Sequence, residues 1–173
     1  MIGESKAVLR PLTEQDMQVM EQWKSYDEAS SQWYQKMLRG RNCKIFAITT
    51  REGRLIGDIG LAEISWRGGD AELSIRIGQE SDWNKGYGME AVMALLELAF
   101  SEMKLKRIYL RVHKANTRAI RCYEKCGFKK EGVVERRLDG NSRVEKVFLM
   151  SILRDEFMSL PGRIGVGPLR KIS

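Results

Sequence analysis

Two segments of this 173-residue sequence combine residue types that can hold a phosphorylated ligand and move a proton. The first, Trp83 to Met89 (WNKGYGM), places two glycines and a lysine just before a helical pattern. Gly86 and Gly88 let the backbone approach a ligand closely, and the exposed amides of a first helical turn favour a diphosphate. Lys85 adds a positive charge there. The segment therefore predicts a phosphate site at the start of a helix.

Other phosphate loops fit this segment less well. A Walker loop requires G-x-x-x-x-G-K-[ST], which the sequence lacks. The dinucleotide fingerprint G-x-G-x-x-G tolerates Ala91 as its last residue, but it belongs in repeated strand–helix–strand units. Here three hairpin-like strands precede the glycines. An isolated G-x-G is also typical of a simple turn before a helix, so the choice depends on the rest of the chain.

The second segment, Asn116 to Phe128 (NTRAIRCYEKCGF), predicts a helix that carries an acid. Asn116 or Thr117 can cap its start, and Gly127 can end it. Tyr123 lies about two helical turns after Asn116, so the two side chains point the same way. A phenol has an ordinary pKa of about 10, so it keeps its proton at neutral pH and can donate it to a more basic group.

The cysteines do not indicate a metal site. Cys122 and Cys126 would share a helix face, but with Cys43 and the single histidine, His113, they do not make a convincing zinc ligand set. A covalent route through a cysteine nucleophile would need a base partner, and His113 is not placed to supply one. We therefore expect three reduced cysteines and a reaction without a covalent intermediate on a cysteine.

The elements that must position these segments follow from hydrophobic periodicity and turn residues. We predict one domain over residues 1–160 and a loose Gly/Pro-rich tail over 161–173. The predicted elements are a strand at Val8–Arg10, helices from Thr13 to about Lys24 and over Glu28–Leu38, strands at Lys44–Thr50, Leu55–Ile64 and Ala71–Ile77, a helix from Gly88 to Met103, a strand at Ile108–Val112, a helix from Asn116 to Gly127, and a hairpin of Val133–Leu138 and Val144–Ile152 around Asp139-Gly140-Asn141.

Composition limits the partners. The net charge of +7 favours polyanions, but the sequence carries no recognised nucleic-acid motif, and a small phosphorylated ligand is also a polyanion. No apolar run approaches the roughly 20 residues that span a bilayer. The N-terminus lacks the apolar region of a signal peptide. We therefore expect a cytoplasmic protein without a membrane partner.

Taken together, the two segments resemble the signatures of the GNAT acetyltransferases. The first resembles the coenzyme A loop [Q/R]-x-x-G-x-[G/A], except that Trp83 stands where Gln or Arg is usual. The second is similar to N-x-x-A-x-x-x-Y-x-K-x-G-F at every fixed position. Leu9–Leu12, with Asp16, resembles the family's opening. Gly132 and Asp139-Gly140 resemble the close of the branch that contains ribosomal-protein alanine and spermidine acetyltransferases.

The resemblance covers about residues 7–156 and implies an α/β (α+β) fold. The expected fold is a mixed, mostly antiparallel central sheet of about seven strands, with about four helices packed on both faces. It also implies acetyl-coenzyme A as cosubstrate and Tyr123 as general acid. The implied cofactor-binding residues are Arg76, Ile77 and Gly78 for the pantetheine arm, Trp83, Asn84, Lys85, Gly86, Tyr87, Gly88 and Met89 for the diphosphate, Asn116 for the pantetheine arm, and Arg121 and Lys125 for the ribose phosphate, beside Tyr123 itself.

The sequence does not decide which residue is the general base or which amine is the acceptor. Glu72 is the first candidate for the base, because its side chain shares a strand face with Ser74 and Arg76; the rivals are Asp70, Glu63 and Glu145. We expect the acceptor to be a protein or peptide N-terminal amine. The alternatives are a small amine, such as a polyamine or an antibiotic, or a non-catalytic coenzyme A sensor. A homodimer is possible.

Overall fold

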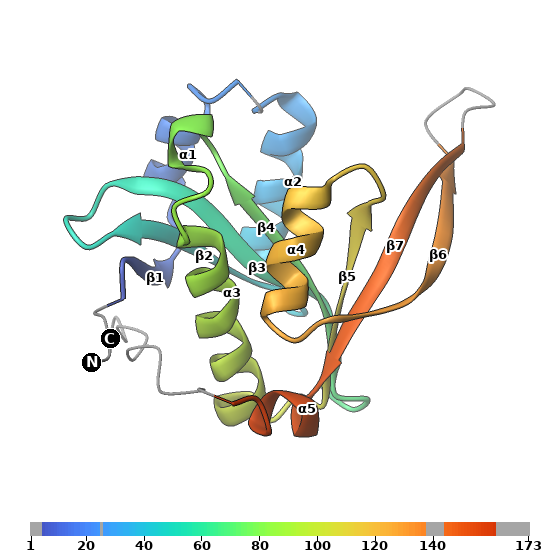
Figure 1. Ribbon diagram of the computed structural model, residues 1–173. Coiled ribbons are helices and arrows are strands. Elements are labelled where there is room, and N and C mark those ends of the chain that lie inside the picture. The colour runs from blue at the N-terminus through green and yellow to red at the C-terminus, as the bar shows by residue number, and fades with distance from the viewer. Residues whose placement is uncertain (1–4, 25, 138–143, 162–173) are drawn as a thin grey trace.

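The computed structural model describes residues 5–24, 26–137 and 144–161. The chain contains both strands and helices, as Figure 1 shows. The strands are β1 (Ala7–Pro11), β2 (Lys44–Thr50), β3 (Leu55–Ser65), β4 (Asp70–Ile77), β5 (Arg107–His113), β6 (Lys129–Arg137) and β7 (Val144–Leu153). The helices are α1 (Glu14–Met20), α2 (Glu28–Arg39), the 3-10 turn η1 (Glu80–Asp82), α3 (Tyr87–Glu97), the π-helical turn η2 (Leu98–Glu102), α4 (Thr117–Lys125) and α5 (Arg154–Met158).

The strands form one seven-stranded sheet in the order β1-β2-β3-β4-β5-β7-β6. Neighbouring strands are antiparallel except β4 and β5, which are parallel. This exception follows from α3, because a helical crossover returns the chain to the same end of the sheet before β5 begins. The sheet confirms the predicted fold class.

Helices cover both faces of the sheet, and each face has its own apolar core (Figure 1). Alternation along β2 feeds the two cores: Ile45 and Ala47 pack with α1 and α2, whereas Phe46 and Ile48 pack with α3 and α4. On the α1 and α2 side, Met20 and Tyr34 are fully buried. The prediction of helices on both faces is confirmed.

The parallel pair separates soon after it begins. Asp70, Ala71 and Glu72 pair with Arg107–Tyr109, and the register goes no further. Beyond that point β4 pairs with β3 up to Ile77, and β5 pairs with β7 up to His113. The carboxyl-terminal halves of β4 and β5 therefore have no shared ladder, and one edge of β4 faces the space under α4.

Most predicted boundaries hold to within two residues. Strand β6 is an exception, because it begins at Lys129, four residues before the predicted Val133. Three further differences concern helices. Helix α1 ends at Met20 rather than near Lys24, although it starts after Thr13 as predicted; Thr13 caps it, and Asp16 completes a capping box. Helix α3 changes at Leu98 into a π-helical turn, in which the Met103 amide donates to the Leu98 carbonyl.

The third difference is α5, which the sequence reading missed. Its five residues offer too little periodicity to detect. The predicted Asp139-Gly140-Asn141 turn and all but the first residue of the predicted tail over 161–173 lie outside the described residues. No described helix is long and apolar enough to cross a membrane.

Candidate active site

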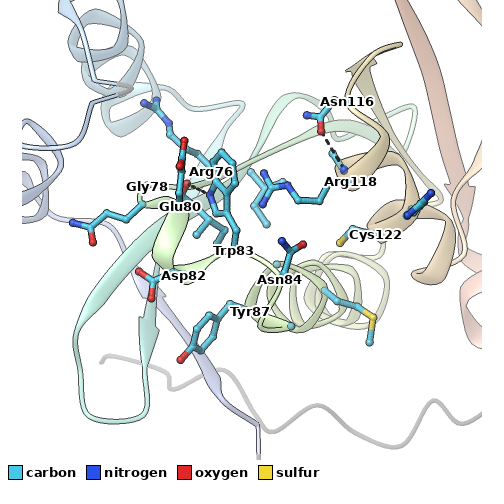
Figure 2. Close-up of a pocket in the computed structure, with 18 of the residues that line it drawn as sticks. Arg76, Gly78, Glu80, Asp82, Trp83, Asn84, Tyr87, Asn116, Arg118 and Cys122 are labelled. Carbon is cyan, nitrogen blue, oxygen red and sulfur yellow. Dashed lines mark hydrogen bonds between the residues drawn. The ribbon is translucent and has the colours of Figure 1, made fainter.

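A cavity of about 1180 Å³ opens where β4 and β5 separate. Its walls come from four places: the end of α1, the end of β4 with the loop after it, the start of α3, and the first turns of α4. Figure 2 shows side chains from β4 and its loop facing those of α4 across this space. The lining residues are Gln22, Trp23, Lys24, Ile75, Arg76, Ile77, Gly78, Gln79, Glu80, Asp82, Trp83, Asn84, Gly86, Tyr87, Gly88, Met89, Asn116, Thr117, Arg118, Ala119, Arg121, Cys122, Tyr123 and Lys125.

The loop before α3 has the backbone that a phosphate site requires. Gly86 is the N-cap residue of α3 at a φ of 88°, and no side chain caps the helix there. The first-turn amides are thus left to the solvent or a ligand, at the positive end of the helix dipole. Asn84 also has a positive φ, of 60°. This backbone supports the predicted diphosphate site.

An ion pair holds this loop in place. Arg54, from the β2–β3 hairpin, makes two hydrogen bonds of 3.0 and 2.9 Å to the carboxylate of Asp82 in η1. Asp82 is 4% exposed, so it needs this partner. The Arg54 guanidinium holds the pKa of Asp82 below its usual range. The loop therefore stays fixed against the sheet without a ligand.

The end of β4 offers only part of the predicted backbone contact. The Gly78 amide donates to the Ile56 carbonyl of β3, so it is not available to a coenzyme. Because strand groups alternate, the Ile77 backbone faces the opposite edge, toward the cavity. There its carbonyl accepts a hydrogen bond of 3.1 Å from Nε1 of Trp83. The predicted pantetheine contact thus remains a prediction for Ile77 and is corrected for the Gly78 amide.

Gly78 has a different role from the one predicted. The ring of Trp23, just after α1, lies directly against its Cα, and a Cβ built there would come within 2.2 Å of the ring. Only glycine permits this approach. Trp23 is 5% exposed and closes the α1 end of the cavity.

Tyr123, the predicted general acid, is a buried tyrosine of α4. It lines the cavity from α4, it is 9% exposed, and its ring meets the edge of Phe128 at a centroid distance of 5.9 Å. Burial raises the pKa of Tyr123 above its usual value, while the charge of Arg118 acts in the opposite direction. The phenol therefore carries its proton at neutral pH, as the proposed acid must.

The other predicted α4 residues also line the cavity. Oδ1 of Asn116 accepts a hydrogen bond of 3.2 Å from the Ala119 amide, so its cap role is confirmed. Only its Nδ2 group could then reach a pantetheine arm. Arg121 and Lys125 lie on the same wall.

Two predicted site residues do not line the cavity among the described residues. Lys85 is absent from the lining, although its charge reaches Asp82 nearby. Glu72 lies in the part of β4 that still pairs with β5, and its carboxylate is 3.3 Å from Arg111. The alternation argument assigned Glu72 the correct face. It sits about 13 Å along the strand from Arg76, however, at about 3.3 Å per residue.

The other candidates for the base either contact another charged residue or do not line the cavity. Asp70 lies 4.0 Å from Arg107, Glu145 contacts His113, and Glu63 is exposed. The described partner of His113 is thus Glu145. Cys122 lines the cavity, and the hydrogen bond from Cys126 lowers the pKa of Cys122. A base role for Glu72 stays a prediction without support from its position.

Sequence reasoning missed a buried polar cluster beside the cavity. Asp58 of β3 is 2% exposed and accepts a hydrogen bond of 2.5 Å from the Tyr34 hydroxyl of α2. Nε of Arg76 is 4.0 Å from the same carboxylate, and its guanidinium lies over the Tyr34 ring. Burial raises the pKa of Asp58 to about 6. The signal was a lone aspartate inside an apolar strand, LIGDIGLA.

Comparison with known proteins identifies the family to which this chain belongs. Residues 6–129, well over half of the chain, match the family described as acetyltransferase (GNAT) domain. The chain belongs to the GNAT acetyltransferase family. As a GNAT enzyme it transfers an acetyl group from acetyl-coenzyme A to an amine, and the cavity between β4, α3 and α4 is where its cosubstrate is expected.

The curated relatives include small-amine acetyltransferases. A spermidine N(1)-acetyltransferase of Vibrio cholerae is 30% identical over 139 residues, which are 80% of this chain and 79% of that protein. The spermidine N(1)-acetyltransferase of Escherichia coli K12 is 25% identical over 165 residues, 87% of this chain and 88% of its own.

Solved structures agree with the fold. A V. cholerae spermidine N-acetyltransferase chimera superposes with a TM-score of 0.78 at 25% identity, covering 90% of this chain and all of that one. The V. cholerae enzyme in complex with coenzyme A and spermine gives a TM-score of 0.75 at 25% identity, over 90% of this chain and 99% of that one.

Proposed function

We propose that this GNAT enzyme acetylates a primary amine of a small polyamine-like molecule. The observation that carries the proposal is the similarity, over four fifths of both chains, to a spermidine N(1)-acetyltransferase. The likeness to a structure that holds coenzyme A and spermine supports it. The alternative of a small amine is therefore better supported than the protein or peptide N-terminal amine that we expected from the sequence.

The proposed reaction is direct transfer. The amine nitrogen attacks the thioester carbonyl, the C–S bond breaks, and the leaving thiolate takes the proton of the Tyr123 hydroxyl. The nitrogen gives up a proton as the amide forms, and this proton restores the phenol through the solvent. The loop from Trp83 to Met89 holds the diphosphate, and the edge of β4 at Ile77 lies along the pantetheine arm. The attacking amine must lose a proton before it reacts, because its pKa of about 10.4 keeps it charged at neutral pH.

The α1 end of the cavity is the place for the acceptor. Trp23 gives it an apolar wall, and Lys24 and Arg76 contribute positive charge. Asp82 is neutralised by Arg54, whereas Glu80 is an exposed carboxylate of the lining. A cationic acceptor would be attracted by Glu80 and repelled by Lys24 and Arg76.

An amine panel tests the proposal. The purified chain is given acetyl-coenzyme A with spermidine, spermine, a monoamine of similar length, an aminoglycoside, or peptides with free N-termini, and the released thiol is followed. We expect the largest kcat/KM for a polyamine, with acetylation of a primary amine in the product by mass spectrometry. A larger kcat/KM for an N-terminal peptide would overturn the choice of acceptor. Tyr123→Phe in parallel separates enzymatic from spontaneous acetylation.

A further inference from the structure

A cation and an aromatic ring meet across the cavity. The guanidinium carbon of Arg118, in the first turn of α4, lies 3.7 Å from the centre of the Trp83 ring. Trp83 belongs to the opposite wall, in the loop before α3. Figure 2 shows the Arg118 side chain reaching from α4 toward Trp83. This contact joins two walls that the separation of β4 and β5 leaves apart.

The ring is the fixed partner in this contact. Its Nε1 donates to the Ile77 carbonyl, and the residue before it, Asp82, is held by two hydrogen bonds from Arg54. Arg118 sits on a helix whose start is capped by Asn116, but its own long side chain can rotate. The indole therefore forms a platform, and the guanidinium is the movable part.

The stacked guanidinium suits a phosphate ligand. When its face lies on a ring, its N–H groups still point outward in the plane, and that fork matches the oxygens of a phosphate. The uncapped amides at the start of α3 lie on the same cavity, at Gly86 to Gly88. An anion between the two would receive donors from both walls.

One position of the coenzyme A loop lacks a polar side chain that could bind a phosphate. Trp83 stands where a Gln or Arg is usual in the coenzyme A loop, so the loop lacks one polar side chain. We propose that Arg118, stacked on Trp83, supplies this missing contact by donating hydrogen bonds to the diphosphate of acetyl-coenzyme A. Trp83 positions it. The proposal rests on the use of acetyl-coenzyme A and not on which amine is acetylated.

Binding of a ligand series, measured by calorimetry without any acceptor, tests this contact. The series is coenzyme A, dephospho-coenzyme A without the ribose phosphate, and pantetheine without any phosphate. Arg118→Ala should weaken the binding of coenzyme A and of dephospho-coenzyme A by a similar factor of about 10 to 100, as expected for the loss of one charged hydrogen-bonding group. The same substitution should not change the affinity for pantetheine. Trp83→Leu should weaken the same two ligands less, and the double variant should lose no more than Arg118→Ala alone.

Two controls sharpen the result. Arg121→Ala removes another cation from the same wall, and its effect should vanish with dephospho-coenzyme A if that residue meets the ribose phosphate. Lys130→Ala removes a cation that lies 4.7 Å from the Phe148 ring outside the cavity lining, and coenzyme affinity should not change. Arg118→Lys keeps the charge but not the planar stack, so it should fall between wild type and Arg118→Ala.

Three outcomes overturn the proposal: Arg118→Ala binds coenzyme A as tightly as wild type, binds it more tightly, or loses the same factor with pantetheine. The second would mean that the Arg118–Trp83 contact blocks the site instead of completing it. If the wild-type chain itself does not bind acetyl-coenzyme A, the proposed function fails before this contact is tested.

Discussion

The two ends of the cavity are built in different ways. The coenzyme end comes from two continuous segments, the loop into α3 and the first turns of α4, and their glycine, asparagine and tyrosine positions act through local backbone geometry. The end that we propose for the acceptor combines Trp23 after α1 and Arg76 of β4, with Asp58 of β3 and Tyr34 of α2 packed beneath Arg76. These residues meet only through the sheet and its helices. The coenzyme end can therefore be recognised from sequence motifs, and the acceptor end cannot.

The largest effect should come from the coenzyme end, where the proposed acid lies. Tyr123→Phe removes only the hydroxyl, so the thiolate must leave unprotonated, and kcat should fall about 100- to 10,000-fold. The ring still packs on Phe128, so coenzyme affinity and thermal stability should be close to wild type. The measurement is turnover under conditions where chemistry is limiting, with calorimetry as the control. Full turnover in this variant would remove Tyr123 from the mechanism.

The acceptor end should instead show its largest effect in the dependence of stability on pH. Asp58 has a pKa of about 6 in the folded chain, above its ordinary value of 3.8, because it is buried. The folded state thus binds the proton more tightly. The stability from this group is fully present below pH 3.8 and is lost as pH rises through about 6, a change of about 3 kcal/mol.

Asp58→Asn removes this titration while keeping an acceptor for the Tyr34 hydroxyl. Urea unfolding at several pH values should show wild type losing about 3 kcal/mol relative to the variant between acid and neutral pH. The unfolding free energy of Asp58→Asn should show no such contribution from position 58 between acid and neutral pH. Parallel curves for the two proteins would mean that Arg76 offsets the burial of the carboxylate.

A matched pair of glycines should give the smallest effect and test whether the loop acts through its backbone. Gly86 and Gly53 have φ values of 88° and 93°, and a Cβ at either would meet nothing within 4 Å. Alanine at each should cost about 1–2 kcal/mol of unfolding free energy, from the left-handed backbone alone. Only Gly86→Ala should also weaken coenzyme binding, by about tenfold, since Gly53 lies in the β2–β3 turn outside the cavity lining.

Equal coenzyme affinity in the two alanine variants would mean that the turn at Gly86 does not shape the diphosphate site. The comparison needs only unfolding curves and calorimetry, because both substitutions impose the same kind of strain. A loss of affinity in Gly53→Ala would point instead to a general loosening of the fold.

The fold was largely predictable from the sequence. Periodic strands and helix start signals placed most of the described elements, and the helices that follow Thr13 and Asn116 begin where predicted. The short α5 was not predictable, because one turn of helix has no distinctive pattern. The choice of Glu72 as base failed to gain support for a related reason. Alternation gives the face of a residue but not how far along β4 the partner strand departs.

What the sequence alone determined is the chemistry of the coenzyme end: a loop of Gly86 and Gly88 that presents amides, and a helix that carries Tyr123 two turns after Asn116. Such features depend on backbone conformation over a few residues, which the residue types dictate. Only the tertiary structure decided that Arg118 stacks on Trp83, that Trp23 covers Gly78, and that Asp58 is buried beside Tyr34. Those contacts arise where β4 and β5 separate and where helices pack on the sheet, and they join residues far apart in the chain.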